Sequence, residues 1–514
     1  MAARKGLALL TVTVASAAAL VSRVFVSDLD AELALSARTC RHNRIANPPL
    51  SGYPDTYYSR TSEEKPLQCA PLSADASVSA DVCVIGGGYA GLHTALSLRE
   101  RGKTVTLLEA DQVGYHASGR NGGMVMAGYA TDITDIEDEV GDAKVASQMY
   151  DDSVQGVKTV ERRISQYAIR CDKKHNGYLL VSPFADRLEE YAELSQHLNG
   201  LLRTADPDSL SRPEGRFRVV PREELRRMIK SVGHYFGLYY PHGFSVNPLA
   251  LSIGLGRALI EQGGKLFEHT CASGVSEAHE SASHGRKFEV STTTGGKVNA
   301  DHVVFCSNVA HPGASKPFFP LASVPVHTYV CVTEPLTEEQ RANFPEDLLV
   351  CDDVFALNYY RLLNDGRLLW GGLCQTYSLD LNDAGDILQG KITEFFPQLE
   401  GTKLDSVWGG TMGFARHHMP MIGRLQAKRL LPMASTNTTG LWYAHGFAGH
   451  GLNTTAMAGN ILADAIVDGD TSKVENFERN YPLCYSGWPF GPLGAQLSYN
   501  WFQLRDWWDL RRRT

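Results

Sequence analysis

The stretch from Ala80 to Gly123, ADVCVIGGGYAGLHTALSLRERGKTVTLLEADQVGYHASGRNGG, decides the fold of this chain. It begins with a short apolar, β-branched run, which predicts a buried parallel strand. That strand leads into Gly86, Gly88 and Gly91, a G-x-G-x-x-G pattern at a strand-to-helix turn. In such a turn the first glycine allows the tight bend, the second lets a pyrophosphate approach the backbone, and the third lets the helix pack on the strand.

The segments after these glycines complete a βαβ unit. A helix is predicted over 90–101, with its first N–H groups facing the phosphates, and a second strand over 104–108 ends at Glu109. An acidic residue about 20 positions after the glycines can accept hydrogen bonds from a ribose. The order of strand, glycine turn, helix, second strand and acidic residue favours an adenine dinucleotide site over a structural glycine turn. It does not decide whether the dinucleotide is FAD or NAD. The cofactor-binding residues expected from this unit are Gly86, Gly88, Tyr89, Ala90, Gly91, Glu109 and Ala110.

Composition narrows the class of protein. The length of 514 residues allows two to four domains, and a hydrophobic content of 43% is enough for large cores. The 49 basic and 57 acidic residues give a net charge of -8, so nothing suggests nucleic-acid binding. Cys83, Cys306 and Cys331 lie in apolar, strand-like runs and no C-x-x-C occurs, which favours buried, reduced thiols. We expect no metal site.

The N-terminus has the composition of a targeting segment. Residues 1–27 contain no acidic residue and include Arg4, Lys5 and Arg23. Three interpretations remain open: a secretory signal, a mitochondrial presequence, or a short membrane anchor. The apolar run is marginal for a span, which needs about 20 residues. We favour a mitochondrial protein associated with the inner membrane. Residues 28–79, rich in Pro, Ser and Tyr, predict an extended surface arm with Tyr57 and Tyr58 as candidate anchors.

A glycine-rich segment, 114–123, follows Glu109 and predicts a loop lying flat against a ligand, with backbone N–H groups free to donate. Together, G-G-G-x-A-G-L, LLEA and ASGRNGG resemble the D-amino-acid oxidase (DAO-type) FAD-dependent oxidoreductases, the D-amino-acid oxidase and glycine oxidase superfamily. The γ-glutamylputrescine oxidase-like branch is the most similar. The resemblance favours FAD over NAD. It adds Ser118, Arg120, Asn121 and Gly122 to the cofactor-binding residues.

The resemblance continues to the C-terminus. The segment 266–272 is similar to the strand whose backbone contacts the adenine, with Ala272 where the family usually has Val, and the turn at Ser307 follows the next flavin-domain strand. The segment 444–451, AHGFAGHG, is similar to the family's closing motif and precedes a predicted helix. The N-terminus of that helix would place positive charge near flavin N1 and O2. This motif adds Gly446, Gly449, His450 and Gly451. His450 is either a flavin contact or an ordinary hydrogen-bonded loop histidine.

The fold implied by the resemblance is α/β (α+β), with an antiparallel-sheet substrate domain inserted into a Rossmann-like FAD-binding domain. The FAD-binding domain is expected from 80–170, 241–320 and 400–475, the substrate domain from 171–240 and 321–399, and a C-terminal tail from 476–514. Noncovalent FAD is expected, because the closing motif contains no cysteine.

The implied reaction is oxidation of a C–N bond of a small amine or amino acid, with hydride transfer to flavin N5. No catalytic residue is assigned; the candidates are Tyr359, Tyr360, Arg361 and His450. Tyr359, Tyr360 and Arg361 are candidates for the wall of the site, and for these three ordinary cross-strand packing is an equal alternative. In amino-acid-oxidising relatives, an Arg that binds the substrate carboxylate stands before the Pro-x-Ile-Gly motif. Met412 occupies that place here, which favours an amine or a larger substrate unless Arg361 or Arg416 substitutes.

The N-terminal segment motivates a rival interpretation. The chain could be an accessory or structural subunit of a mitochondrial membrane (respiratory) complex that keeps the flavoprotein fold with little turnover. A third, weaker interpretation is an NAD-binding protein. The sequence leaves open the substrate, the electron acceptor and the oligomeric state.

Overall fold

The computed structural model describes residues 48–175, 177–205, 215–277, 286–309, 322–425, 439–487 and 490–511. The targeting segment expected over 1–27 and the first part of the arm lie outside these residues. Within the described part of the chain, none of the helices combines the length and the apolar character that crossing a membrane requires.

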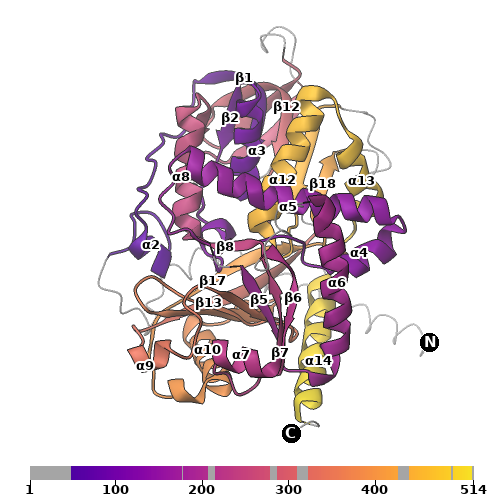
Figure 1. Ribbon diagram of the computed structural model, residues 1–514. Coiled ribbons are helices and arrows are strands. Elements are labelled where there is room, and N and C mark those ends of the chain that lie inside the picture. The colour runs from indigo at the N-terminus through magenta and orange to yellow at the C-terminus, as the bar shows by residue number, and fades with distance from the viewer. Residues whose placement is uncertain are drawn as a thin grey trace, which may run out of the picture.

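The described residues form two eight-stranded sheets, one above the other, and a small three-stranded sheet (Figure 1). The upper sheet has the order β10-β11-β12-β1-β2-β9, with β19 also pairing with β12 and β18 pairing with β19. Its centre is parallel, because β1 pairs in parallel with both β2 and β12. The strands are β1 (Ser77–Ile85), β2 (Val105–Leu108), β9 (Lys265–Phe267), β10 (Ala272–Glu277), β11 (Phe288–Thr292), β12 (Lys297–Phe305), β18 (Met421–Arg424) and β19 (Leu441–His445). This confirms the Rossmann-like domain.

Helices α3 (Tyr89–Glu100), α8 (Pro248–Glu261) and α12 (Gly451–Ala463) pack side by side, and α5 (Ala143–Gln166) crosses α12. Asn247 starts α8 by accepting the N–H of Ala250 at 3.1 Å, with Pro248 in the first turn. A Cβ at Gly459 of α12 would lie 2.7 Å from the backbone of His93 in α3. The glycine therefore sets the close approach of the two helices that flank the cofactor region.

The lower sheet has the order β17-β13-β16-β15-β14-β5-β7-β6 and is antiparallel except where β14 meets β5. Helices α7 (Arg222–Met228), α9 (Glu338–Arg341) and α10 (Leu381–Phe395) lie on its side away from the upper domain (Figure 1). The small sheet has the order β3-β8-β4. The strands of the two sheets are β3 (Met124–Met126), β4 (Lys174–His175), β5 (Tyr178–Ser182), β6 (Arg218–Val220), β7 (Phe236–Tyr240), β8 (Gly243–Ser245), β13 (Val324–Thr333), β14 (Leu349–Asp352), β15 (Tyr359–Leu362), β16 (Leu368–Gln375) and β17 (Leu404–Phe414).

The remaining helices cover edges and connections. They are α2 (Tyr57–Thr61), α4 (Ile133–Val140), α6 (Leu188–Ala205), α7 (Arg222–Met228), α9 (Glu338–Arg341), α10 (Leu381–Phe395), α13 (Ser472–Asn480) and α14 (Gly491–Arg511). Short 3₁₀ turns span Ala117–Gly119, Ala185–Arg187 and Pro397–Leu399, and a π-helical turn over Asp464–Asp468 continues α12.

One of the expected domain boundaries is wrong. Strand β17 lies inside the segment 400–475 assigned to the FAD-binding domain. It nevertheless pairs with β13 from Val324 to Thr333 and is an edge strand of the lower sheet, which we also call the substrate sheet. The C-terminal tail, expected over 476–514, packs on both sheets. Helix α13 packs on β18 of the upper sheet, whereas α14 contacts β13 and β16 of the lower one.

Residues 53–58 of the arm lie between the two domains. Thr56 and Ser59 form a reciprocal capping box that starts α2. Tyr57 and Tyr58 are buried, and the Tyr58 ring meets the Trp408 ring edge-on with centroids 5.4 Å apart. The same cluster includes Leu249 of α8 and Val330 of β13. Tyr57 and Tyr58 therefore anchor the arm, as the sequence indicated.

The buried tyrosine of the arm gives a stability prediction. Tyr58→Ala removes a fully buried ring between the domains and should cost about 3–5 kcal/mol, the range for large aromatic-to-alanine changes in cores. The thermal midpoint of the purified protein should fall by several degrees. Tyr485→Ala is the control, because Tyr485 is 62% exposed, and it should leave the midpoint unchanged. Equal midpoints for the two variants would contradict the role of the arm.

Candidate active site

The glycine turn between β1 and α3 has the geometry that a dinucleotide needs. Gly86 has φ +112°, and a Cβ there would lie 2.6 Å from the Cys306 carbonyl oxygen. A Cβ on Gly91 would overlap the Gly86 carbonyl group. The near neighbour of Gly88 is instead one side chain, with Ser118 Oγ 2.9 Å from the position of a Cβ. Gly86 and Gly91 therefore hold the turn together, and Gly88 presents bare backbone.

Glu109 lies across the turn, at the end of β2. Its Oε2 accepts the N–H of Gly87 at 2.5 Å, and its Oε1 accepts the N–H of Asp111 at 2.8 Å. Burial raises the pKa of the Glu109 carboxyl, while the two N–H donors favour its charged form. The carboxyl group thus lies beside the glycines, where a ribose would be bound. Ala110, the next residue, is exposed at this edge.

Two further features fit FAD. The Ser307 hydroxyl, which follows β12 beside Gly86, is buried and has no hydrogen-bond partner in the structure. Ala272 opens β10 and is buried at 1% exposure. A glycine cradle, a carboxylate and an unsatisfied hydroxyl on adjacent strands match a dinucleotide. Residues 86–91 would hold the pyrophosphate and Glu109 the ribose.

The loop 117–123, which we call the flavin loop, is held in place by its own side chains and by the lower sheet. Asn121 donates to the carbonyl groups of Ala117 and Ser118 at 3.0 and 2.9 Å, and its own oxygen accepts the N–H of Gly123 at 2.9 Å. Ser118 Oγ accepts the N–H of Tyr89 at 3.0 Å, which caps the start of α3. These contacts fix the loop against the glycine turn.

Arg120 joins this loop to β17. Its Nε donates to the carbonyl of Tyr115 at 2.9 Å and its Nη1 to that of Gly409 at 3.4 Å. In return, Trp408 Nε1 donates to the Arg120 carbonyl at 2.8 Å. The substrate sheet therefore helps to hold the flavin loop.

Arg361 makes a second connection of the same kind. It is 6% exposed, and it donates from Nε to the Gly122 carbonyl at 3.1 Å and from Nη2 to the Val246 carbonyl at 2.9 Å. These two bonds hold the loop from the lower sheet.

The three candidate residues on β15 alternate across the sheet. The Tyr359 ring lies beside the flavin loop, because a Cβ on Gly122 would be 2.5 Å from it. Tyr360 is on the opposite face, where it stacks on Trp370 with centroids 4.6 Å apart in the core against α10. Of the two alternatives given for Tyr360, the structure therefore selects cross-strand packing, and Tyr360 lies outside the wall of the site.

The closing loop 446–451 supplies the other wall. Gly446, Ala448 and Gly449 have φ values of +65°, +49° and +84°, so the chain turns sharply before α12 begins at Gly451. The first N–H groups of α12 point at this loop and carry partial positive charge. A Cβ on Gly449 would lie 3.3 Å from Met412 Sδ, which places Met412 against the loop.

His450 is a neutral member of this loop. Burial lowers the pKa of its imidazole to about 4, so it is uncharged near neutral pH. Its Nε2 lies 3.3 Å from the Met126 carbonyl, which can only accept a hydrogen bond, so this nitrogen carries the proton. The contact joins the start of α12 to β3. It favours the hydrogen-bonded loop histidine, with positive charge near the site supplied by α12.

Several residues around the inner face of the lower sheet had not been singled out from the sequence. Met124 of β3 lies with its Sδ 4.0 Å from Cys351 Sγ of β14. Tyr178 and Tyr240 stack across β5 and β7 with centroids 4.2 Å apart. The alternation of side chains in these short strands could have indicated that these residues share one face of the sheet. Which face points toward the site depends on how the strands pair, and this cannot be read from the sequence.

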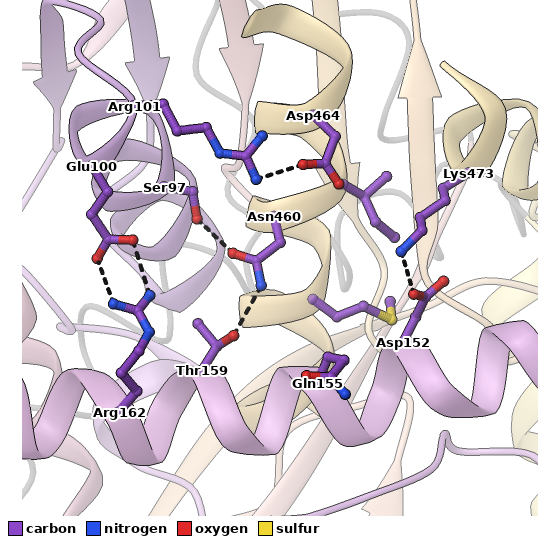
Figure 2. Close-up of a pocket in the computed structure, with 12 residues that line it drawn as sticks. Ser97, Glu100, Arg101, Asp152, Gln155, Thr159, Arg162, Asn460, Asp464 and Lys473 are labelled. Atoms are coloured by element: carbon purple, nitrogen blue, oxygen red, sulfur yellow. Dashed lines mark hydrogen bonds and ion pairs between the residues drawn. The ribbon is translucent and has the colours of Figure 1, made fainter. Parts of the chain in front are cut away.

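A separate cavity of about 360 Å³ lies between α3, α5 and α12 (Figure 2). Its charged groups are paired, with Arg101 to Asp464 at 2.5 Å, Arg162 to Glu100 at 3.0 Å and Lys473 to Asp152 at 2.5 Å. It lies at the C-terminal end of α3, about 18 Å of helix from the glycine turn. The cavity is therefore distinct from the candidate active site. Among the described residues, no group of three or more His, Cys, Asp or Glu could hold a metal ion.

The turn at Gly88 gives a prediction for the cofactor. Gly88→Val places a branched side chain where a pyrophosphate would meet the backbone, and should cut the bound FAD of the purified protein at least tenfold. The ratio of flavin to protein absorbance measures this. Gly390→Val is the control, because Gly390 lies on α10 and no atom outside its own stretch of helix is within 4 Å of its Cβ position. Full FAD content in Gly88→Val would refute the placement of the pyrophosphate.

Comparisons with known proteins agree with this geometry. Residues 81–465 match the DAO family model, described as FAD dependent oxidoreductase. The gamma-glutamylputrescine oxidoreductase of Escherichia coli (strain K12) is 30% identical over 468 residues, 89% of this chain and 99% of that protein. A probable oxidoreductase OrdL of Haemophilus influenzae is 28% identical over 459 residues, 87% of this chain and 96% of that protein.

Solved structures share the fold. The L-proline dehydrogenase of P. horikoshii superposes with a TM-score of 0.61 at 17% identity, covering 79% of this chain and 98% of that one. The glycine oxidase of Geobacillus kaustophilus gives a TM-score of 0.59 at 18% identity, covering 76% and 95%. The glycine turn, the flavin loop, the closing motif and the family match lead to one conclusion: this chain belongs to the DAO family of FAD-dependent oxidoreductases.

Proposed function

We propose that this FAD-dependent oxidoreductase oxidises the C–N bond of an amine whose reacting carbon carries no carboxylate group. The observation that carries the proposal is Met412. It stands where the resemblance places the carboxylate-binding arginine of amino-acid-oxidising relatives, and it packs against Gly449 of the closing loop. A thioether cannot pair with a carboxylate. The relative from E. coli is named for an amine, and this also supports an amine substrate.

The arginines that could have replaced it are placed elsewhere. Arg361 donates to two backbone carbonyl groups beneath the flavin loop. Arg416 is exposed, beyond the end of β17. Arg120 donates to backbone carbonyl groups of Tyr115 and Gly409. These positions support a substrate held without a guanidinium–carboxylate pair.

The bound FAD would supply the chemistry of accepting a hydride from the carbon next to the nitrogen. The protein would orient the substrate between the flavin loop and the lower sheet. Burial raises the pKa of Tyr359 well above its ordinary value, so its hydroxyl keeps its proton near neutral pH. Tyr359 can therefore orient a substrate by donating a hydrogen bond, but it does not serve as a base. The start of α12 would stabilise negative charge that develops on the cofactor side.

The rival interpretation, an accessory subunit of a membrane complex, has no observation in its favour among the described residues or the relatives named above. The mitochondrial, inner-membrane location stays a prediction, because it rests on residues 1–27.

The experiment is anaerobic reduction of the flavin in the holoenzyme. Putrescine, γ-glutamylputrescine, glycine, D-alanine and L-proline are each mixed with the protein, and the loss of flavin absorbance near 450 nm is followed. We expect reduction by an amine at least tenfold faster than by any of the amino acids. Faster reduction by an amino acid would overturn the proposal. Flavin that none of these compounds reduces would favour the accessory subunit.

Met412 gives a direct test of substrate preference. Met412→Arg should raise kcat/KM for an amino acid relative to the amine by about tenfold or more, because a guanidinium can then pair with a carboxylate. Met412→Leu, the control, keeps the volume without the charge and should leave the ratio near that of the original protein. An unchanged ratio in Met412→Arg would show that position 412 does not meet the substrate.

A further inference from the structure

The C-terminal helix α14 exposes several large apolar side chains to solvent, whereas its buried residues include the polar side chains of Gln496 and Asp506. Leu493, Leu497, Trp501, Leu504 and Trp508 recur at intervals of three and four residues, which places them on one face. They are 47%, 62%, 64%, 55% and 51% exposed. We call these five residues the α14 stripe. A packed terminal helix normally shows the opposite arrangement.

The inward face of α14 is held by polar contacts. Gln496 Nε2 donates to Gln375 Oε1 at 2.6 Å, and its Oε1 accepts the N–H of Thr376 at 2.8 Å. Asp506 Oδ2 accepts the N–H of Phe355 at 2.6 Å. Gln496 and Asp506 are both buried. The orientation of the helix is therefore fixed by these bonds, and the outward position of the stripe is a property of the fold.

The stripe extends over about 22 Å of helix, given a rise of 1.5 Å per residue. Contiguous exposed apolar surface of this kind marks an interaction site on a folded protein. Trp507, 46% exposed, lies beside the stripe with Arg511 over its ring at 4.3 Å. Leucine and tryptophan side chains bordered by arginine match the boundary between lipid headgroups and acyl chains.

The charged residues near the α14 stripe indicate which kind of surface it would bind. The whole chain carries a net charge of -8, but the end of α14 and the residues after it read Arg511-Arg512-Arg513 in the sequence. Arg505 is also exposed next to the stripe. Basic residues beside an interfacial helix are attracted to anionic lipid headgroups, and this attraction weakens with salt. We propose that the α14 stripe docks the protein on the surface of a membrane that contains anionic lipid, without crossing it.

Docking would involve a helix that also supports the candidate active site. The Phe355 ring packs against Tyr499 and Phe502 of α14, with centroids 5.2 and 5.0 Å apart. Phe355 belongs to the connection between β14 and β15, and β15 begins at Tyr359. The membrane-facing helix and the wall of the site are thus separated by one short loop.

The test uses the full-length holoenzyme and vesicles of phosphatidylcholine, alone or mixed with phosphatidylglycerol. The combined variant Leu497→Glu, Trp501→Glu should reduce binding to the mixed vesicles at least tenfold. Val232→Glu is the matched control, because Val232 is also 62% exposed but lies outside α14. It should bind as the original protein does. All variants should keep their FAD, since neither residue of the combined variant touches the cofactor region.

A second readout follows the tryptophans. Trp501, Trp507 and Trp508 are exposed, whereas Trp370, Trp408 and Trp442 are buried. Vesicles with brominated acyl chains should therefore quench the emission of the original protein, and added salt should reduce the quenching. Binding that is unchanged in the combined variant would overturn the proposal and assign attachment to another segment. A dimer that the same variant converts to monomers, with no vesicle binding by the original protein, would assign the stripe to a second copy of the chain.

Discussion

The guanidinium of Arg361 connects the two halves of this enzyme. It comes from the substrate sheet and donates to the carbonyl groups of Gly122, in the flavin loop, and Val246, just before α8. At 6% exposure, a charged side chain needs such partners to offset the cost of its desolvation. Hydrogen bonds that involve a charged group contribute about 1.5–3 kcal/mol each. The loop that must lie against the flavin is therefore held from the opposite domain.

Other contacts reinforce this connection. Trp408 donates to the Arg120 carbonyl, and the Tyr58 ring of the arm meets the Trp408 ring edge-on. The arm, the flavin loop and the β17 edge thus form one continuous contact. Such an arrangement lets the substrate sheet determine the position of the flavin loop, and it leaves Tyr359 and Met412 on the face that looks toward the loop and the closing motif. The chemistry of the site then depends on which side chains these two strands present.

Much of the cofactor domain could be predicted from the sequence. The helix expected over 90–101 is α3 at Tyr89–Glu100, and Glu109 lies beside the glycine turn, because local glycine spacing and apolar periodicity define this unit. Strand β17 was assigned to the wrong domain, since its partner β13 is far away in sequence and pairing cannot be read from a strand alone. The position of Tyr360 could not be predicted for a related reason. The sequence shows that side chains alternate along β15, but not which set of them faces the site. The positioning role of Arg361 was hidden because its acceptors are backbone atoms of distant segments.

The central claim is that Arg361 positions the flavin loop from the substrate domain, and the FAD dissociation constant tests it most directly. Arg361→Lys keeps the charge but loses the two-armed geometry. Apoprotein of this variant, titrated with FAD, should show a dissociation constant about tenfold higher, equivalent to about 1.4 kcal/mol, and the lost hydrogen bonds should also lower its thermal midpoint. Arg416→Lys, at an exposed arginine, serves as the control and should bind FAD as the original protein does. Equal dissociation constants for Arg361→Lys and the original protein would contradict the account.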